Sequence, residues 1–147
     1  MGFMLACDIV IAADDAKFGT PEVNVGLWPM IIGALIFRNV VRKKAMEMIL
    51  LGERMSAQEA LAMGLITRVA HASSLDEETD KILKTLCSKS PIGMKIGKQA
   101  YSEVENMPLN EALSVLSERL KLVVATEDAK EGITAFIEKR QPVFMGR

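Results

Sequence analysis

The chain has 147 residues, half of them hydrophobic and a quarter charged, which predicts one domain of ordinary size and excludes a disordered tail. Eighteen basic and nineteen acidic side chains give a net charge of −1. We expect no nucleic-acid partner, because general nucleic-acid binders usually carry a basic excess. Cys7 and Cys87 are too few for a disulfide scaffold and lack metal-ligand spacing. We therefore expect no metal, a cytoplasmic location and cysteines packed as small hydrophobic side chains.

The first half of the chain predicts two short strands before the helices begin. Ile9–Ala12 is a β-branched run typical of a strand buried on both faces, and Phe18–Gly19 indicates a second extended piece. The prolines of residues 20–29 favour an irregular loop, because each proline disfavours the α region for the residue before it. A further strand is expected at Leu65–Val69. From residue 30 the apolar spacing is helical and predicts helices over residues 30–41, 43–51, 56–64, 74–88, 90–106, 108–125 and 127–139.

Several of these helices have recognisable ends. Gly52 predicts the end of the helix over residues 43–51. Ser56 and Glu59 form a capping-box pattern, in which hydroxyl and carboxylate each satisfy an otherwise unpaired backbone N–H. Ser90 before Pro91 predicts an N-cap and a first-position proline. The apolar run over residues 30–41 is too short to span a bilayer and is expected in a core or at a subunit contact, so we expect no membrane partner.

Seven helices against two or three isolated strands cannot form a covered parallel sheet by themselves. The chain therefore looks like the second part of an α/β fold whose first strands lie outside it. Three stretches then carry a family resemblance: residues 18–27 (FGTPEVNVGL), 52–60 (GERMSAQEA) and 131–142 (EGITAFIEKRQP). With these motifs the chain resembles the crotonase superfamily of enoyl-CoA hydratases and isomerases, over residues 2–142.

The resemblance implies an α/β fold built as a ββα spiral, here truncated at its N-terminus. Residues 1–70 correspond to the C-terminal part of the spiral core. Residues 71–147 correspond to a helical region that mediates oligomerisation, as a homo-trimer or hexamer, and closes the CoA site. The implied substrate is an acyl-CoA thioester, with no separate cofactor.

Glu22 matches one of the family's catalytic carboxylates, which act as acid and base in hydration of the α,β double bond. Read without the resemblance, it is a solvated carboxylate in a surface loop. The second carboxylate position of the family falls on Gly2, which cannot transfer a proton. The choice between hydration and double-bond isomerisation therefore stays open.

The family also stabilises an enolate-like oxyanion with two backbone N–H groups, usually the largest single contribution to such a reaction. Both donors are expected in residues that precede Met1, so we expect the 147-residue chain alone to be inactive. The leading prediction is an enoyl-CoA hydratase/isomerase-like protein of fatty-acid β-oxidation, active in its full-length context. The alternative is a catalytically inactive remnant that serves as an assembly or interaction module.

Phe136 and Lys139 are the candidate CoA-binding residues, because the resemblance places the last helix near the CoA site, with the lysine close to a phosphate. Their spacing of three predicts that they share one helix face. The alternative is a solvated helix end, where Lys139 complements the helix dipole.

Overall fold

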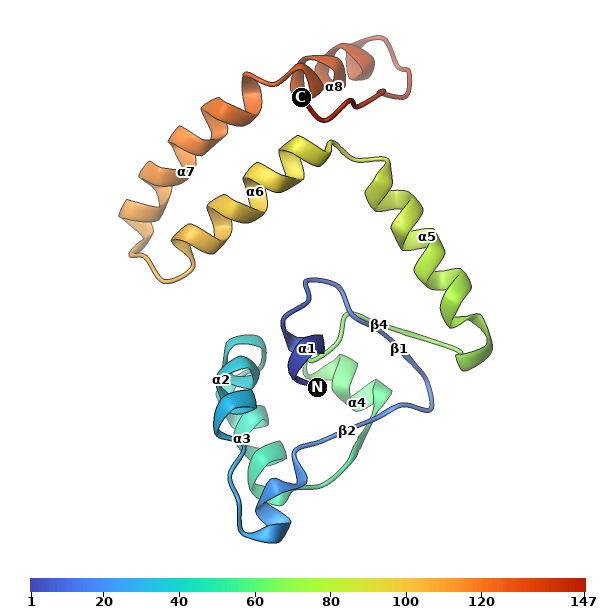
Figure 1. Ribbon diagram of the computed structural model, residues 1–147, viewed down its shortest axis with the longest axis vertical. Coiled ribbons are helices and arrows are strands. Elements are labelled where there is room, and N and C mark those ends of the chain that lie inside the picture. The colour runs from blue at the N-terminus through green and yellow to red at the C-terminus, as the bar shows by residue number, and fades with distance from the viewer. The chain divides into compact units, whose positions relative to one another are not determined.

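The computed structural model describes residues 1–147, which divide into two compact units, Met1–Lys81 and Ile82–Arg147 (Figure 1). The length of the chain predicted one domain. The boundary falls within helix α5 (Leu75–Cys87), none of whose side chains is buried. The functional division at residue 70 remains a prediction.

The first unit holds the strands and four short helices. Its further elements are α1 (Gly2–Leu5), β1 (Ile11–Ala13), β2 (Lys17–Phe18), the 3₁₀ helix η1 (Pro21–Val25), α2 (Met30–Asn39), α3 (Arg42–Leu51), β3 (Met55–Ser56), α4 (Ala57–Ala62), β4 (Arg68–Ala70) and the 3₁₀ helix η2 (Ala72–Ser74). Strand β1 pairs with β4 in parallel, and β2 pairs with β3 antiparallel. One expected strand is shorter than predicted. The strand predicted at 65–69 begins at Arg68, because its pairing with β1 starts there, opposite Ile11.

The core of the first unit lies where α2, α3 and α4 meet the two strand pairs. Its buried side chains are Leu5, Ala12, Ile36, Val40, Ala45, Met48, Ile49, Ala57, Ala60, Leu65 and Ile66. Only part of helix α2 is buried in this core. Its Gly33 and Ile36 are buried, whereas Met30 and Ile31 on the same helix are exposed.

The predicted helix ends of the first unit are confirmed. Gly52 follows α3 with a left-handed φ of 59°, and a Cβ atom there would lie 2.6 Å from Val23 Cγ2, so the position demands glycine. The Ser56 hydroxyl accepts a hydrogen bond from the Glu59 N–H, and the Glu59 carboxylate accepts one from the Ser56 N–H, which completes the capping box.

The second unit contains helices and a C-terminal tail but no strand. Helix α6 (Pro91–Val104) lies beside α7 (Leu109–Val124), and α8 (Glu127–Ile137) contacts both (Figure 1). Ser90 caps α6 as predicted, accepting a hydrogen bond from the Gly93 N–H. Few side chains are fully buried: Ala100, Val104, Ala112, Asp128 and Ala135. Most leucines of α7 are exposed.

The prediction for the two cysteines is wrong. Cys7 and Cys87 are both free and exposed, so neither packs as a small hydrophobic side chain. Cys7 follows the single turn of α1 and donates its thiol hydrogen to the Phe3 carbonyl. Cys87 ends α5, the helix without a buried side chain.

Candidate functional site

Glu22 lies in η1, directly after β2. This segment was predicted to be an irregular loop, which is wrong for residues 21–25. Proline is favourable at the first position of a helical turn, where it needs no N–H partner, and Pro21 takes that position. Gly26 ends the 3₁₀ helix with a left-handed φ of 77°, and the Glu22 carbonyl accepts a hydrogen bond from the Leu27 N–H.

Contacts to α3 hold this 3₁₀ helix in place. The Asn24 amide donates to the Gly52 carbonyl over 3.0 Å, at the end of α3. Val23 packs so close to Gly52 that no larger residue fits there. The backbone on either side of Glu22 is therefore anchored to a helix end, and the carboxylate is carried on a positioned turn.

The Glu22 carboxylate itself is left without a partner in the protein. The residue is half-buried, and its Oε2 atom is buried and accepts no hydrogen bond. A buried carboxylate oxygen without a donor is costly, because it has lost its hydration without compensation. Such an atom is available to a proton or to a bound molecule.

Gly2, the position that the resemblance assigns to the second carboxylate, is the first residue of α1 and is exposed. A Cβ atom built there would meet nothing within 4 Å. The backbone at this position therefore leaves room for a larger side chain.

Phe136 and Lys139 do not share a helix face, so that prediction is wrong. Phe136 lies on α8 and is 84% exposed. Helix α8 ends at Ile137, and Lys139 has a φ of 55°, the only positive φ outside the glycines. The Arg140 N–H bonds back to the Ala135 carbonyl over 3.0 Å, which closes a Schellman-type helix end with lysine where glycine is usual.

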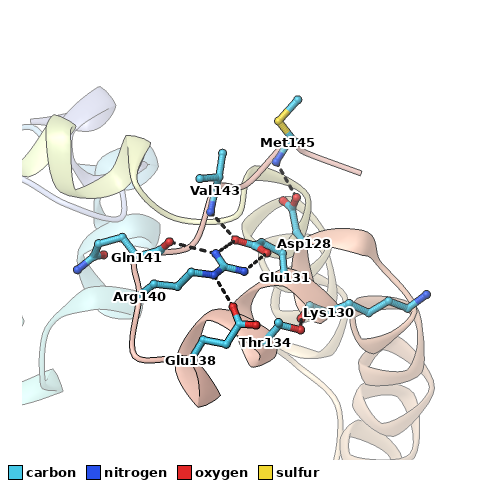
Figure 2. A network of polar contacts seen from close by, with 9 residues as sticks. All are labelled: Asp128, Lys130, Glu131, Thr134, Glu138, Arg140, Gln141, Val143 and Met145. Carbon is cyan, nitrogen blue, oxygen red and sulfur yellow. Dashed lines mark hydrogen bonds and ion pairs between the residues drawn. The ribbon is translucent and has the colours of Figure 1, made fainter.

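A polar network connects α8 to the C-terminal tail, residues 138–147 (Figure 2). The sequence pattern did not predict this network. Arg140 donates to both oxygens of Glu131 over 2.6 and 2.8 Å, and to Glu138 over 2.6 Å. The Arg140 side chain, followed by the Val143 N–H, lowers the pKa of Glu131 to about 2. Glu131 and Arg140 both lie within the family motif of residues 131–142, but nothing in that motif marks them as an ion pair.

Asp128 forms the second part of this network and is 2% exposed. Its carboxylate accepts hydrogen bonds from the Ser90 hydroxyl over 2.7 Å and from the backbone N–H groups of Met145 and Gly146. Burial by itself would raise the pKa of the Asp128 carboxyl. These hydrogen bonds outweigh burial, so the pKa lies below its ordinary value.

Other candidate sites are absent or lie elsewhere. A cavity of about 400 Å³ opens between α3 and α4, and neither Glu22 nor Gly2 lines it. No group of three His, Cys, Asp or Glu side chains is gathered as a metal site would need. No helix is long and apolar enough to cross a membrane.

Comparison with known proteins identifies the family. The family model described as enoyl-CoA hydratase/isomerase matches residues 1–147. The chain belongs to the enoyl-CoA hydratase/isomerase family. The solved structure of an enoyl-CoA hydratase from Mycobacterium smegmatis is similar to it with a TM-score of 0.93 at 31% identity, over 97% of this chain and 56% of that one. The crotonase-like α/β fold expected from the motifs is confirmed.

Two curated relatives illustrate the range of family members that it matches. The mitochondrial enoyl-CoA hydratase domain-containing protein 3 of Homo sapiens is 40% identical over 139 residues, which cover 95% of this chain and 46% of the relative. The 2,3-dehydroadipyl-CoA hydratase of Escherichia coli is 35% identical over 144 residues, covering 97% of this chain and 56% of the relative. The chain thus spans about half the length of the curated relatives it matches.

Proposed function

We propose that this family member acts on acyl-CoA thioesters as an enoyl-CoA hydratase or isomerase, through an oxyanion-stabilised enolate, as in fatty-acid β-oxidation. The observation that carries the proposal is Glu22: a carboxylate in the family's FGTPE segment, on an anchored 3₁₀ turn, with a buried oxygen that no protein group occupies. A free carboxylate at a fixed position is what proton transfer next to a thioester carbonyl requires. We also propose a cytoplasmic location, which the two free cysteines support.

Glu22 would serve the two reactions differently. In isomerisation, one carboxylate removes a proton from one carbon, leaving an enolate, and returns it to another carbon. In hydration, the water oxygen bonds to the β-carbon and a proton reaches the α-carbon, a task usually shared by two carboxylates. Because Gly2 has no side chain, isomerisation is the reaction that the existing residues can serve with the fewest additions.

Phe136 and Lys139 are our candidates for CoA contacts. Phe136 presents an exposed aromatic ring, and Lys139 holds a strained backbone conformation that glycine would adopt more easily. Backbone strain often accompanies a functional position. The exposed apolar side chains of α7 and α8, among them Leu109, Leu113 and Ile137, support a subunit contact, and we propose a homo-trimer or hexamer.

The test follows the consumption of a short enoyl-CoA thioester by the protein in its full-length context, with Glu22 in place and with Glu22→Gln. We expect Glu22→Gln to lower turnover at least about a hundredfold, the usual contribution of a general acid–base group. Glu53→Gln is the matched control, because Glu53 is an exposed carboxylate of the same unit, and it should leave turnover unchanged. Full turnover by Glu22→Gln would contradict the role of Glu22.

A second variant separates hydration from isomerisation. Gly2→Glu adds the missing carboxylate at a position with free space. If the carboxylate reaches the substrate, Gly2→Glu should raise hydration relative to isomerisation. An unchanged product ratio would contradict the assignment of position 2.

The alternative function is a catalytically inactive assembly module, which Gly2 and the exposed apolar face of α7 favour. In the same full-length context it predicts no Glu22-dependent turnover and no CoA binding, together with stable self-association. Turnover that depends on Glu22 would exclude it.

A further inference from the structure

Two neighbouring side chains in the first unit end in buried polar atoms without a hydrogen-bond partner in the protein: Thr20 Oγ1 and Glu22 Oε2. Thr20 is 1% exposed, so its hydroxyl is as deeply enclosed as a core side chain. Most buried polar atoms in proteins find a partner, and one that does not requires an explanation. Here the two exceptions lie two residues apart.

The Thr20 hydroxyl does not make the capping hydrogen bond that its position offers. It is the N-cap residue of η1, yet its side chain accepts no capping hydrogen bond. Thr126 has the same role at α8, and its hydroxyl accepts from the Ala129 N–H over 3.1 Å and donates to the Val123 carbonyl over 2.7 Å. The Thr20 hydroxyl therefore does not bond the backbone N–H group of η1 that an N-cap threonine ordinarily binds.

The two atoms belong to residues that are close together in the chain. Cα atoms two residues apart lie at most about 7 Å from one another, and both side chains extend from this short segment. A buried water needs two to four polar partners, and a hydroxyl and a carboxylate oxygen supply two of them. Pro21 between them has no N–H to compete for either oxygen.

We propose that Thr20 is a positioning residue for Glu22, and that its hydroxyl and Glu22 Oε2 hold one water molecule between them. Only the catalytic meaning of this site rests on the proposed function. The water orients the Glu22 carboxylate and keeps its inner oxygen hydrated without a protein donor. Thr20 acts through the water and does not itself touch the substrate.

A thermal-melting cycle tests the water site without substrate. Trp28, the single tryptophan, lies in the first unit and reports its unfolding by fluorescence. Thr20→Val and Glu22→Met each remove one holder of the water and leave the other atom buried and alone, so each should lower the melting temperature. The double variant removes both polar atoms and should melt above the value that the two separate decreases predict.

The opposite pattern overturns the proposal. If no water is shared, both atoms are already unpaired, and Thr20→Val should raise the melting temperature by an amount that simply adds to that of Glu22→Met. Two controls exclude a mere distortion of η1. Thr20→Ser keeps the hydroxyl and should behave like the wild type. Thr20→Val combined with Asn24→Ala, in the same 3₁₀ helix, should be additive; equal coupling in both cycles would also overturn the proposal.

The catalytic meaning has its own readout. In an enoyl-CoA turnover assay, Thr20→Val should lower kcat about tenfold with KM unchanged, and Thr20→Ser should restore it. An unchanged kcat in Thr20→Val would overturn the positioning role. Absence of all turnover in the full-length context would contradict the proposed function and leave the melting result to decide the water site.

Discussion

The turn that carries Glu22 and the first turn of α8, which carries Asp128, both contain a carboxylate that is at least partly buried. The two carboxylates differ in their hydrogen bonding. Asp128 accepts hydrogen bonds from one hydroxyl and two backbone N–H groups, whereas Glu22 Oε2 accepts none. A buried carboxylate with protein donors holds segments together, whereas one without a protein donor remains open to water or to a bound molecule. The hydrogen-bonded carboxylate thus stabilises the second unit, and we propose that the unpartnered one serves catalysis in the first.

The largest effect is expected from Asp128→Asn. The substitution removes the charge and replaces one acceptor by a donor that faces the N–H groups of Met145 and Gly146. We expect the melting temperature of the second unit to fall by several degrees and amide exchange of residues 143–147 to accelerate. Ser114→Ala on exposed α7, which loses only a local bond to Asn110, is the control and should change little. A wild-type melting temperature in Asp128→Asn would contradict the structural role of Asp128.

The next largest effect is expected from acid, which should lower the stability of the second unit. The pKa of Glu131 is about 2 in the folded chain against an ordinary 4.5, so its stabilisation is complete above about pH 4.5. It is lost as the pH falls from there towards 2, and the lowered pKa of Asp128 acts in the same direction. Urea unfolding followed by amide exchange over residues 82–147 measures this loss. Glu131→Gln should flatten the pH dependence; an unaltered slope would contradict the role of its ion pair with Arg140.

The smallest effect concerns Lys139, which has a strained backbone just after the end of α8. Lys139→Gly should stabilise the second unit by about 1 kcal/mol, because glycine adopts the left-handed conformation without the Cβ penalty. Lys139→Ala keeps the penalty and should not stabilise. Both variants remove the ammonium group and should weaken CoA binding in a calorimetric titration. Unchanged CoA affinity in both would show that the strain has no such purpose.

Local patterns predicted the parts of the fold that depend on neighbours in the sequence. Gly52, the Ser56–Glu59 capping box and Ser90 were all confirmed, because each acts within one helical turn. Lys139 was misplaced because the helix ends earlier, where the chain turns and Arg140 reaches back to Glu131 across nine residues. No local pattern encodes such a contact.

The candidate site was predictable only in part. The motif over residues 18–27 placed Glu22 correctly in the segment after the second strand, and the family itself is confirmed. The missing partners of Thr20 and Glu22 could not be predicted, since an unused hydrogen bond leaves no trace in the sequence. The exposure of Cys7 and Cys87 likewise depends on which helix faces are covered.

The central claim is that Asp128 is structural and Glu22 is not, and amide hydrogen exchange of Asp128→Asn and Glu22→Gln tests it directly. Exchange resolves residues 1–81 from 82–147, so each variant is measured in its own unit. We predict a clear loss of protection in the second unit of Asp128→Asn and wild-type protection in the first unit of Glu22→Gln. A loss in Glu22→Gln as large as that in Asp128→Asn would contradict the account.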